Sequence, residues 1–185
     1  MTNDAITGFI LGVLSTLLST LLVAIIMFWL QGRRDVQREA IRQRHEDTRV
    51  ARNWAQDGKK ASLRGFDLAG ANLSGKDIAG ADLEDCNLEG AQMWETNLTG
   101  ANLIRANFKN AKLVEVKLCD AKLNLANFDS TVLWKVDFSR AKLRKTRLLN
   151  ARIEDCIWTD AKIDETTEID VALRQVIVAQ TSDAK

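Results

Sequence analysis

The residues best suited to chemistry in this 185-residue chain are one histidine, three cysteines and many carboxylates. His45 precedes Glu46, but no second histidine lies four residues away, so the ligand pair of a zinc-protease helix is absent. The odd number and the spacing of Cys86, Cys119 and Cys156 favour neither a disulfide framework nor a zinc site, and we interpret them as small core or surface residues. No glycine-rich phosphate loop occurs. We therefore expect no enzyme, no catalytic, cofactor-binding or metal-binding residues, and no small-molecule substrate.

Composition divides the chain into two parts. Lys and Arg number 26 against 25 Asp and Glu, a net charge of +1, which excludes a uniformly basic nucleic-acid binder and a uniformly acidic protein. Residues 5–32 contain no charged side chain at all, whereas the remainder is rich in charges of both signs. The two parts call for separate interpretations.

The uncharged stretch AITGFILGVLSTLLSTLLVAIIMFWLQG, residues 5–32, exceeds the roughly 20 residues that a helix needs to cross a bilayer. We expect a transmembrane helix rather than a cleaved signal peptide, because Asp4 precedes it and bulky side chains close it. Seven arginines and four acids follow in residues 33–52, and no Lys or Arg precedes the stretch. The positive-inside rule then predicts a single-pass membrane location with a cytoplasmic C-terminal domain, and the lipid bilayer as one partner.

Two features of this part leave alternatives open. Gly8 and Gly12 form a small-xxx-small pair that would let two such helices approach closely, although small residues are common in membrane helices anyway. Residues 33–58 are predicted as a basic juxtamembrane helix and an N-terminal cover for the domain that follows. This helix either lies near anionic lipid headgroups or is simply solvated.

From Leu63 to Ile163 an apolar residue recurs at every fifth position. The residue two positions earlier is usually Ala, and the residue between them is usually polar or charged. A helix buries a face every 3.6 residues and a strand every second residue, so a sustained period of five indicates repeated three-residue strands joined by corners. Glycines such as Gly65 and Gly70 supply the backbone freedom that tight corners need.

The units ANLSG, ADLED, TNLTG, ANLIR and ANFKN resemble the pentapeptide-repeat family, whose motif is written A(D/N)LXX. The resemblance covers residues 61–165. It implies an all-β solenoid, namely a right-handed quadrilateral β-helix in which four units make one coil of twenty residues. About five coils, stacked at roughly 4.8 Å, would form a rod about 24 Å long.

A solenoid exposes core and unpaired strand edges at both ends, so we expect a cover at each. Val50 and Trp54 suit the N-terminal cover, and the amphipathic stretch around Ile169 and Ile177 predicts a C-terminal capping helix. The predicted organisation is a transmembrane helix at 5–32, a basic helix and cover at 33–58, the β-helix at 59–165, the capping helix at 166–180 and a tail at 181–185.

Two inward positions depart from the small-residue pattern. Phe66 and Lys76 occupy them in the first coil, so we expect that coil to be loosened, with Lys76 reaching out through the open end. At mid-shaft the alternation places Leu103 inward and Asn102 outward. Aspartate is therefore expected to be disruptive at Leu103 and tolerated at Asn102.

Residues twenty apart should stack, because one coil has twenty residues. Trp94, Val114 and Trp134 would then form one outward column, with Val132 beside Trp134. Contiguous exposed apolar surface usually marks a contact site. A second copy of the chain in a homodimer, another protein, or the chain's own helix folding back would cover this column. The plainer alternative is that the tryptophan rings tilt and lie along the outer surface of the solenoid.

Lys122, Lys142 and Lys162 would stack in a second column, which either meets an acidic partner or a nucleic acid, or only keeps the protein soluble. Residues 61–104 carry seven acids and two bases, whereas residues 105–152 carry twelve bases and four acids. The rod therefore lacks the continuous negative charge of a DNA mimic, and we do not expect a nucleic-acid partner. We predict a membrane-anchored, non-catalytic protein-interaction or scaffolding module; the alternative is a membrane-tethered modulator of a topoisomerase or other nucleic-acid enzyme.

Overall fold

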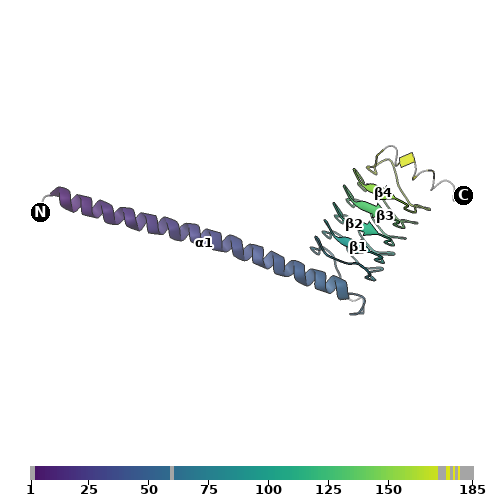
Figure 1. The fold of residues 1–185 in the computed structure, drawn as a ribbon, viewed down its shortest axis with the longest axis horizontal. Coiled ribbons are helices and arrows are strands. Elements are labelled where there is room, and N and C mark those ends of the chain that lie inside the picture. The colour runs from purple at the N-terminus through teal and green to yellow at the C-terminus, as the bar shows by residue number, and fades with distance from the viewer. Residues whose placement is uncertain (1–2, 59–60, 171–173, 176, 178, 180–185) are drawn as a thin grey trace. The chain divides into compact units, whose positions relative to one another are not determined.

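The computed structural model describes residues 3–58, 61–170, 174, 175, 177 and 179, with helix side chains described from Leu21 onward. The chain divides into two compact units, residues 1–42 and 43–185. One long helix, α1 (Asn3–Asn53), is followed by four short strands (Figure 1). The strands are β1 (Gln92–Trp94), β2 (Lys112–Val114), β3 (Val132–Trp134) and β4 (Arg152–Glu154).

The N-terminal part differs from the prediction. Across the described residues, no helix combines the length and the apolar composition that crossing a membrane requires. The predicted transmembrane helix at 5–32 and the single-pass location are therefore corrected, and the bilayer partner and cytoplasmic placement that depended on them lose their support. A single helix, α1, runs through the stretch that we divided at residue 32.

The β-helix solenoid predicted for the second unit is confirmed. Strands β1 to β4 form one parallel sheet in chain order (Figure 1). Gln92 pairs with Lys112, Lys112 with Val132, and Val132 with Arg152, so each pairing advances by twenty residues. Isolated parallel bridges repeat the same offset on the other faces, for example between Asn102 and Lys122. Four five-residue units therefore return the chain to the same face.

Two backbone hydrogen bonds recur in every coil. The amide of a central apolar residue donates to the following coil, as from Leu103 to the carbonyl of Lys122 at 2.8 Å. The amide of the polar residue before it donates to the preceding coil, as from Asn102 to the carbonyl of Ala81 at 2.9 Å. Each coil is thus joined to both of its neighbours, and the register of each depends on the next.

The shaft is filled by the predicted inward rows. The central residues and the small residues two positions earlier are fully buried along most of the repeat, with Leu103 and Ala101 as examples. Aromatic residues stack inside, because Phe138 and Trp158 are twenty residues apart and their ring centroids lie 4.3 Å apart. Trp158 therefore fits inside the shaft as a member of a stack.

Corners require a left-handed residue at the end of each unit. Glycine meets this need in the first coils, as at Gly65 with a φ of 72°, but the later corners use other residues, including Leu125 with a φ of 64°. A side chain in this conformation costs roughly 1–2 kcal/mol. The corners of the later coils are therefore maintained by the coil-to-coil hydrogen bonds rather than by local preference.

At the N-terminal end of the shaft, side chains replace the missing coil. Asp47 is buried, and its carboxylate accepts hydrogen bonds from the amide of Asp67 at 3.0 Å and from Gln43 Nε2 at 2.8 Å. The Asp67 amide occupies the position that in other coils donates to a backbone carbonyl of the preceding coil. Trp54 is also buried, and its indole Nε1 donates to the carbonyl of Ala61 at 2.7 Å. The last turns of α1 thus complete the first strand edge.

At the C-terminal end, the repeat continues further than predicted. Thr167, Glu168 and Ile169 repeat the small–polar–large pattern, and Glu168 bridges Arg147, an offset of 21 rather than twenty. One inserted residue hides this unit from a strict five-residue count. The beginning of the predicted capping helix at 166–180 is therefore wrong. Residues 171–173, 176, 178 and 180, and the tail at 181–185, lie outside the described residues, although Ile177 is buried in the core.

Replacing Leu103 with Asp should lower the free energy of unfolding by more than about 4 kcal/mol, because the shaft offers no partner for a buried carboxylate. The matched control is Asn127→Asp. Asn127 points outward, and its side-chain oxygen accepts the amide of Asp129 at 2.9 Å, an interaction that Asp preserves. Urea unfolding followed by circular dichroism measures both variants, and equal destabilisation would contradict the inward and outward register.

Replacing Asp47 with Ala should cost about 1–3 kcal/mol of stability, because the Asp67 amide at the end of the shaft loses its acceptor. Asp47→Asn keeps an oxygen at this position and should recover most of the loss. Thermal unfolding of the two variants checks the role of the carboxylate. If both variants unfold at the same temperature as the unmodified protein, the first coil does not depend on this cap.

Candidate functional site

Strands β1, β2 and β3 bring the predicted apolar residues onto one face of the solenoid. Trp94 pairs with Val114 and Val114 with Trp134, in register along three successive coils. Val132 lies two residues before Trp134 on the same strand, with the buried Leu133 between them. We call Trp94, Val114, Val132 and Trp134 the apolar column. In the next coil, Glu154 of β4 pairs with Trp134 and ends the column with a charge.

Exposure is uneven along the apolar column. Trp94 is 58% exposed and Val132 is 36% exposed, whereas Val114 and Trp134 are half-buried. The ammonium Nζ of Lys135 lies 4.2 Å from the centroid of the Trp134 ring, within the range of a cation–π interaction, and 3.9 Å from Glu115 Oε1. Trp134 is therefore partly covered by its own neighbour, and Trp94 is the most accessible side chain of the column.

Lys122, Lys142 and Lys162 form the predicted second column. Parallel bridges connect Lys122 with Lys142 and Lys142 with Lys162, and all three residues are exposed. Residues of this column follow those of the apolar column by two units, which is half a coil. The lysine column and the apolar column therefore lie on opposite faces, and the structure does not combine them into one site.

The lysine column is an exception to the charge pattern of the solenoid. Most other charged residues twenty apart have opposite signs, as in the pairs of Arg140 with Asp120 at 2.7 Å and Arg144 with Asp164 at 3.1 Å, although Glu95 and Glu115 are alike. Like charges on neighbouring strands repel each other. The three stacked lysines are thus destabilising to the rod.

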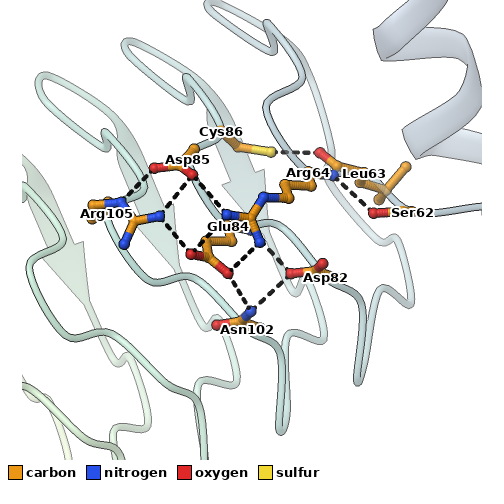
Figure 2. Close-up of polar contacts among 9 residues, drawn as sticks. All are labelled: Ser62, Leu63, Arg64, Asp82, Glu84, Asp85, Cys86, Asn102 and Arg105. Carbon is orange, nitrogen blue, oxygen red and sulfur yellow. Dashed lines mark hydrogen bonds and ion pairs between the residues drawn. The ribbon is translucent and has the colours of Figure 1, made fainter.

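A network of four charged residues joins the first three coils and was not predicted (Figure 2). Arg64 lies 2.8 Å from Glu84, and Arg105 contacts both Glu84 and Asp85, with Nε 2.6 Å from the Asp85 carboxylate. The hydrogen bond from Arg105 is the main cause that lowers the pKa of Asp85. Glu84 is only 15% exposed and receives both guanidinium groups. The twenty-residue spacing of Arg64 with Glu84 and of Asp85 with Arg105 is the sequence signal that would have revealed this network.

Asn102 lies beside this network, and its environment changes one expectation. Its amide Nδ2 donates to Asp82 at 2.8 Å and to Glu84 at 3.2 Å (Figure 2), while its Oδ1 is buried without a partner among the described residues. Aspartate at position 102 would remove both donors and add a negative charge beside two carboxylates. Asn102→Asp should therefore destabilise the protein, contrary to what its outward position alone predicts.

The three cysteines have inert surroundings. The Cys86 thiol donates to the carbonyl of Leu63 at 2.8 Å, and burial raises its pKa to about 12. Burial is also the main cause that raises the pKa of Cys119 and of Cys156 to about 11. Such thiols carry little thiolate near neutral pH, so none is an activated nucleophile. In the described part of the chain, no cluster of three or more His, Cys, Asp or Glu side chains is arranged to hold a metal ion.

Other predicted and exposed residues lie apart from the columns. Gly8 and Gly12 belong to the part of α1 whose side-chain surroundings are not described, so the helix contact predicted for them remains a prediction. Leu125 and Ile157 are each 48% exposed, although the sequence pattern did not single them out. Leu125 is at a corner and Ile157 is in a slot that is usually polar, so both were detectable as apolar residues at outward positions.

A parallel solenoid of five-residue units with outward columns defines a class of repeat protein. The family model described as pentapeptide repeats (8 copies) matches residues 59–90, 81–120 and 121–157, which together cover more than half of the 185 residues. The chain therefore belongs to the pentapeptide repeat family. No curated protein matches it.

Solved structures of pentapeptide repeat proteins resemble the chain. HetL, a protein from the cyanobacterium Nostoc sp. strain PCC 7120 involved in heterocyst differentiation regulation, is 27% identical, with a TM-score of 0.54. The match covers 55% of this chain and 48% of HetL, so the chain spans about half of that relative. A pentapeptide repeat protein from the thylakoid lumen of Arabidopsis thaliana is 26% identical over 63% of this chain and 77% of its own, with a TM-score of 0.44.

Replacing Lys142 with Glu should stabilise the solenoid by about 0.5 kcal/mol, because two repulsive contacts with Lys122 and Lys162 become attractive. Added salt should reduce the gain, since exposed charges are screened. Thermal unfolding at low and high ionic strength measures the effect, with Lys142→Gln as the neutral control. A destabilised Glu variant would show that the lysines do not repel one another in the folded protein.

Proposed function

We propose that the protein is a non-catalytic protein-interaction module that presents the apolar column as its contact surface. The observation that supports this most directly is the 58% exposure of Trp94 on β1, in register with Val114 and Trp134. An exposed aromatic side chain contributes little hydrophobic free energy to folding. Trp is among the residues most enriched at interaction hot spots. A partner that covers the ring would recover the hydrophobic free energy that the fold leaves unused.

The backbone that carries the apolar column is rigid. Each strand of the column is paired in parallel with the strand of the next coil, and Met93, Leu113 and Leu133 anchor the strands by pointing into the core. The side chains are therefore presented in one arrangement before a partner arrives. Such preorganisation reduces the entropy lost on binding.

The size of the apolar column fits the centre of an interface. Trp94, at 58% exposed, supplies the largest share of the area that a partner could bury, and the less exposed Val114, Val132 and Trp134 add to it, so the column is the centre rather than the whole of the roughly 800 Å² that each partner usually buries. Charged and polar neighbours such as Gln92, Lys112 and Glu115 surround the column and would form the polar rim. A partner with an apolar patch bordered by charges would match this arrangement.

The alternative role, modulation of a topoisomerase or other nucleic-acid enzyme, receives no support from the surface. The lysine column is cationic, and two acidic residues of the first coils, Glu84 and Asp85, are paired with Arg64 and Arg105. We therefore do not propose this alternative. A role in differentiation is likewise not transferred from HetL, because the match covers 48% of that protein.

A photo-crosslinking amino acid at position 94 tests the proposal in cells of the source organism. Crosslinks to a defined protein, or to a second copy of the chain, are expected from position 94 and should be lost when Trp134 is also replaced with Lys. Position 125 is the matched control, because Leu125 is similarly exposed but lies outside the apolar column. Absence of crosslinks from position 94, or the same crosslinks from both positions, would overturn the proposed surface.

A further inference from the structure

A pocket of about 260 Å³ lies where the last turns of α1 cover the first coil of the solenoid. Its lining comes from two elements of the same compact unit, the helix and the first coil. The lining residues are His45, Thr48, Arg49, Arg52, Asn53 and Lys76. Three of these six side chains are cationic at neutral pH, and none is a carboxylate.

Lys76 is the residue of this pocket that the fold does not explain. It occupies an inward position whose equivalents in the following coils are the fully buried Thr96, Val116 and Val136. Lys76 itself is partly exposed and lines the pocket, so its side chain turns away from the shaft. The predicted exit through an open end is thus corrected: the end is covered by α1, and Lys76 reaches a pocket within that cover.

The positive charges of the pocket are only partly balanced. Arg49 donates from Nε to Glu46 at 3.0 Å, and this pairing is the main cause that lowers the pKa of Glu46. Within the described part of the chain, neither Arg52 nor Lys76 has an ion-pair partner. The negative end of the helix dipole favours arginines in the last turns of α1. The helix dipole does not act on the first coil, so it does not explain why a lysine occupies position 76.

We propose that this pocket binds a phosphate group. Guanidinium groups match phosphate oxygens with paired donors, and a lysine ammonium adds a point charge from a second direction. The Thr48 hydroxyl and the Asn53 amide lie among the lining residues as neutral donors. A tetrahedral anion with several free oxygens can contact donors from both the helix and the coil, whereas a carboxylate has only two oxygens to share between them.

The volume suits a small phosphorylated group. At about 30 Å³ for each water molecule in the liquid, the pocket holds roughly eight or nine waters. This is room for inorganic phosphate or for a phosphate monoester with a small substituent. Binding would connect Arg52 of α1 to Lys76 of the first coil and so fasten the cover to the solenoid, independently of the apolar column.

The test is thermal unfolding and calorimetric titration of the full-length protein with inorganic phosphate at roughly 0.1–10 mM, against chloride at matched ionic strength. We expect a saturable rise in Tm with phosphate and a smaller or absent rise with chloride. Lys76→Ala should weaken phosphate binding at least about tenfold, because a charge-assisted contact is lost. Its Tm in chloride should stay the same or increase, because an unpaired cation is removed from an inward position.

Two further variants make the result decisive. Arg52→Gln changes an exposed residue with no ion pair among the described residues and should weaken phosphate binding without unfolding the protein, even if Lys76→Ala does not fold. Lys142→Ala, on the lysine column, should leave binding unchanged. Phenyl phosphate in a parallel titration distinguishes a monoester ligand, which it would mimic, from free phosphate. Absence of saturable binding of both probes, or equal binding by the unmodified protein and Arg52→Gln, would overturn the proposal.

Discussion

The twenty-residue register of the backbone hydrogen bonds is the constraint on which the rest of the structure depends. Each coil donates to the coil before it and to the coil after it, as Asn102 and Leu103 do from adjacent positions. Because the offset is the same on every face, side chains twenty residues apart must stack. Core rows, aromatic stacks, the apolar column and the charge pairs are all consequences of this one repeat.

The sequence was sufficient to predict whatever follows directly from that register. The apolar period of five identified Leu103 and its equivalents as core, because no other regular structure buries every fifth residue. The placement of Trp94, Val114 and Trp134 in one line required only the length of the coil. The charge network of Arg64, Glu84 and their partners could have been found with the same arithmetic, by comparing the signs of charges twenty residues apart.

The ends of the solenoid could not be predicted in this way, because the repeat does not determine them. Asp47 belongs to a helix and matches no repeat position, yet it accepts the backbone amide that the first coil leaves unpaired. The unit at Thr167 is hidden by a single inserted residue, because the strict five-residue count ends before it. At the N-terminus, composition divides the chain at residue 32, whereas α1 continues through that position. The transmembrane helix predicted from this division is not found among the described residues. The sequence shows that Lys76 is a charged residue at an inward position. It does not show which residues surround Lys76, because that depends on how α1 covers the first coil.

The inserted residue before Thr167 has a consequence for how such a chain changes length during evolution. A one-residue insertion within a strand between Leu63 and Ile163 would exchange inward and outward side chains there, and one at a corner would shift the pairing of the coils beyond it by one residue. At the last unit it shifts only the pairing of Glu168 with Arg147, from twenty to 21 residues, and Ile169 still packs against the core. Duplication or loss of a complete coil of twenty residues keeps the remaining coils paired in the same register. A change of length by whole coils therefore preserves the stacking, and a smaller change disturbs the fewest pairings at the terminus.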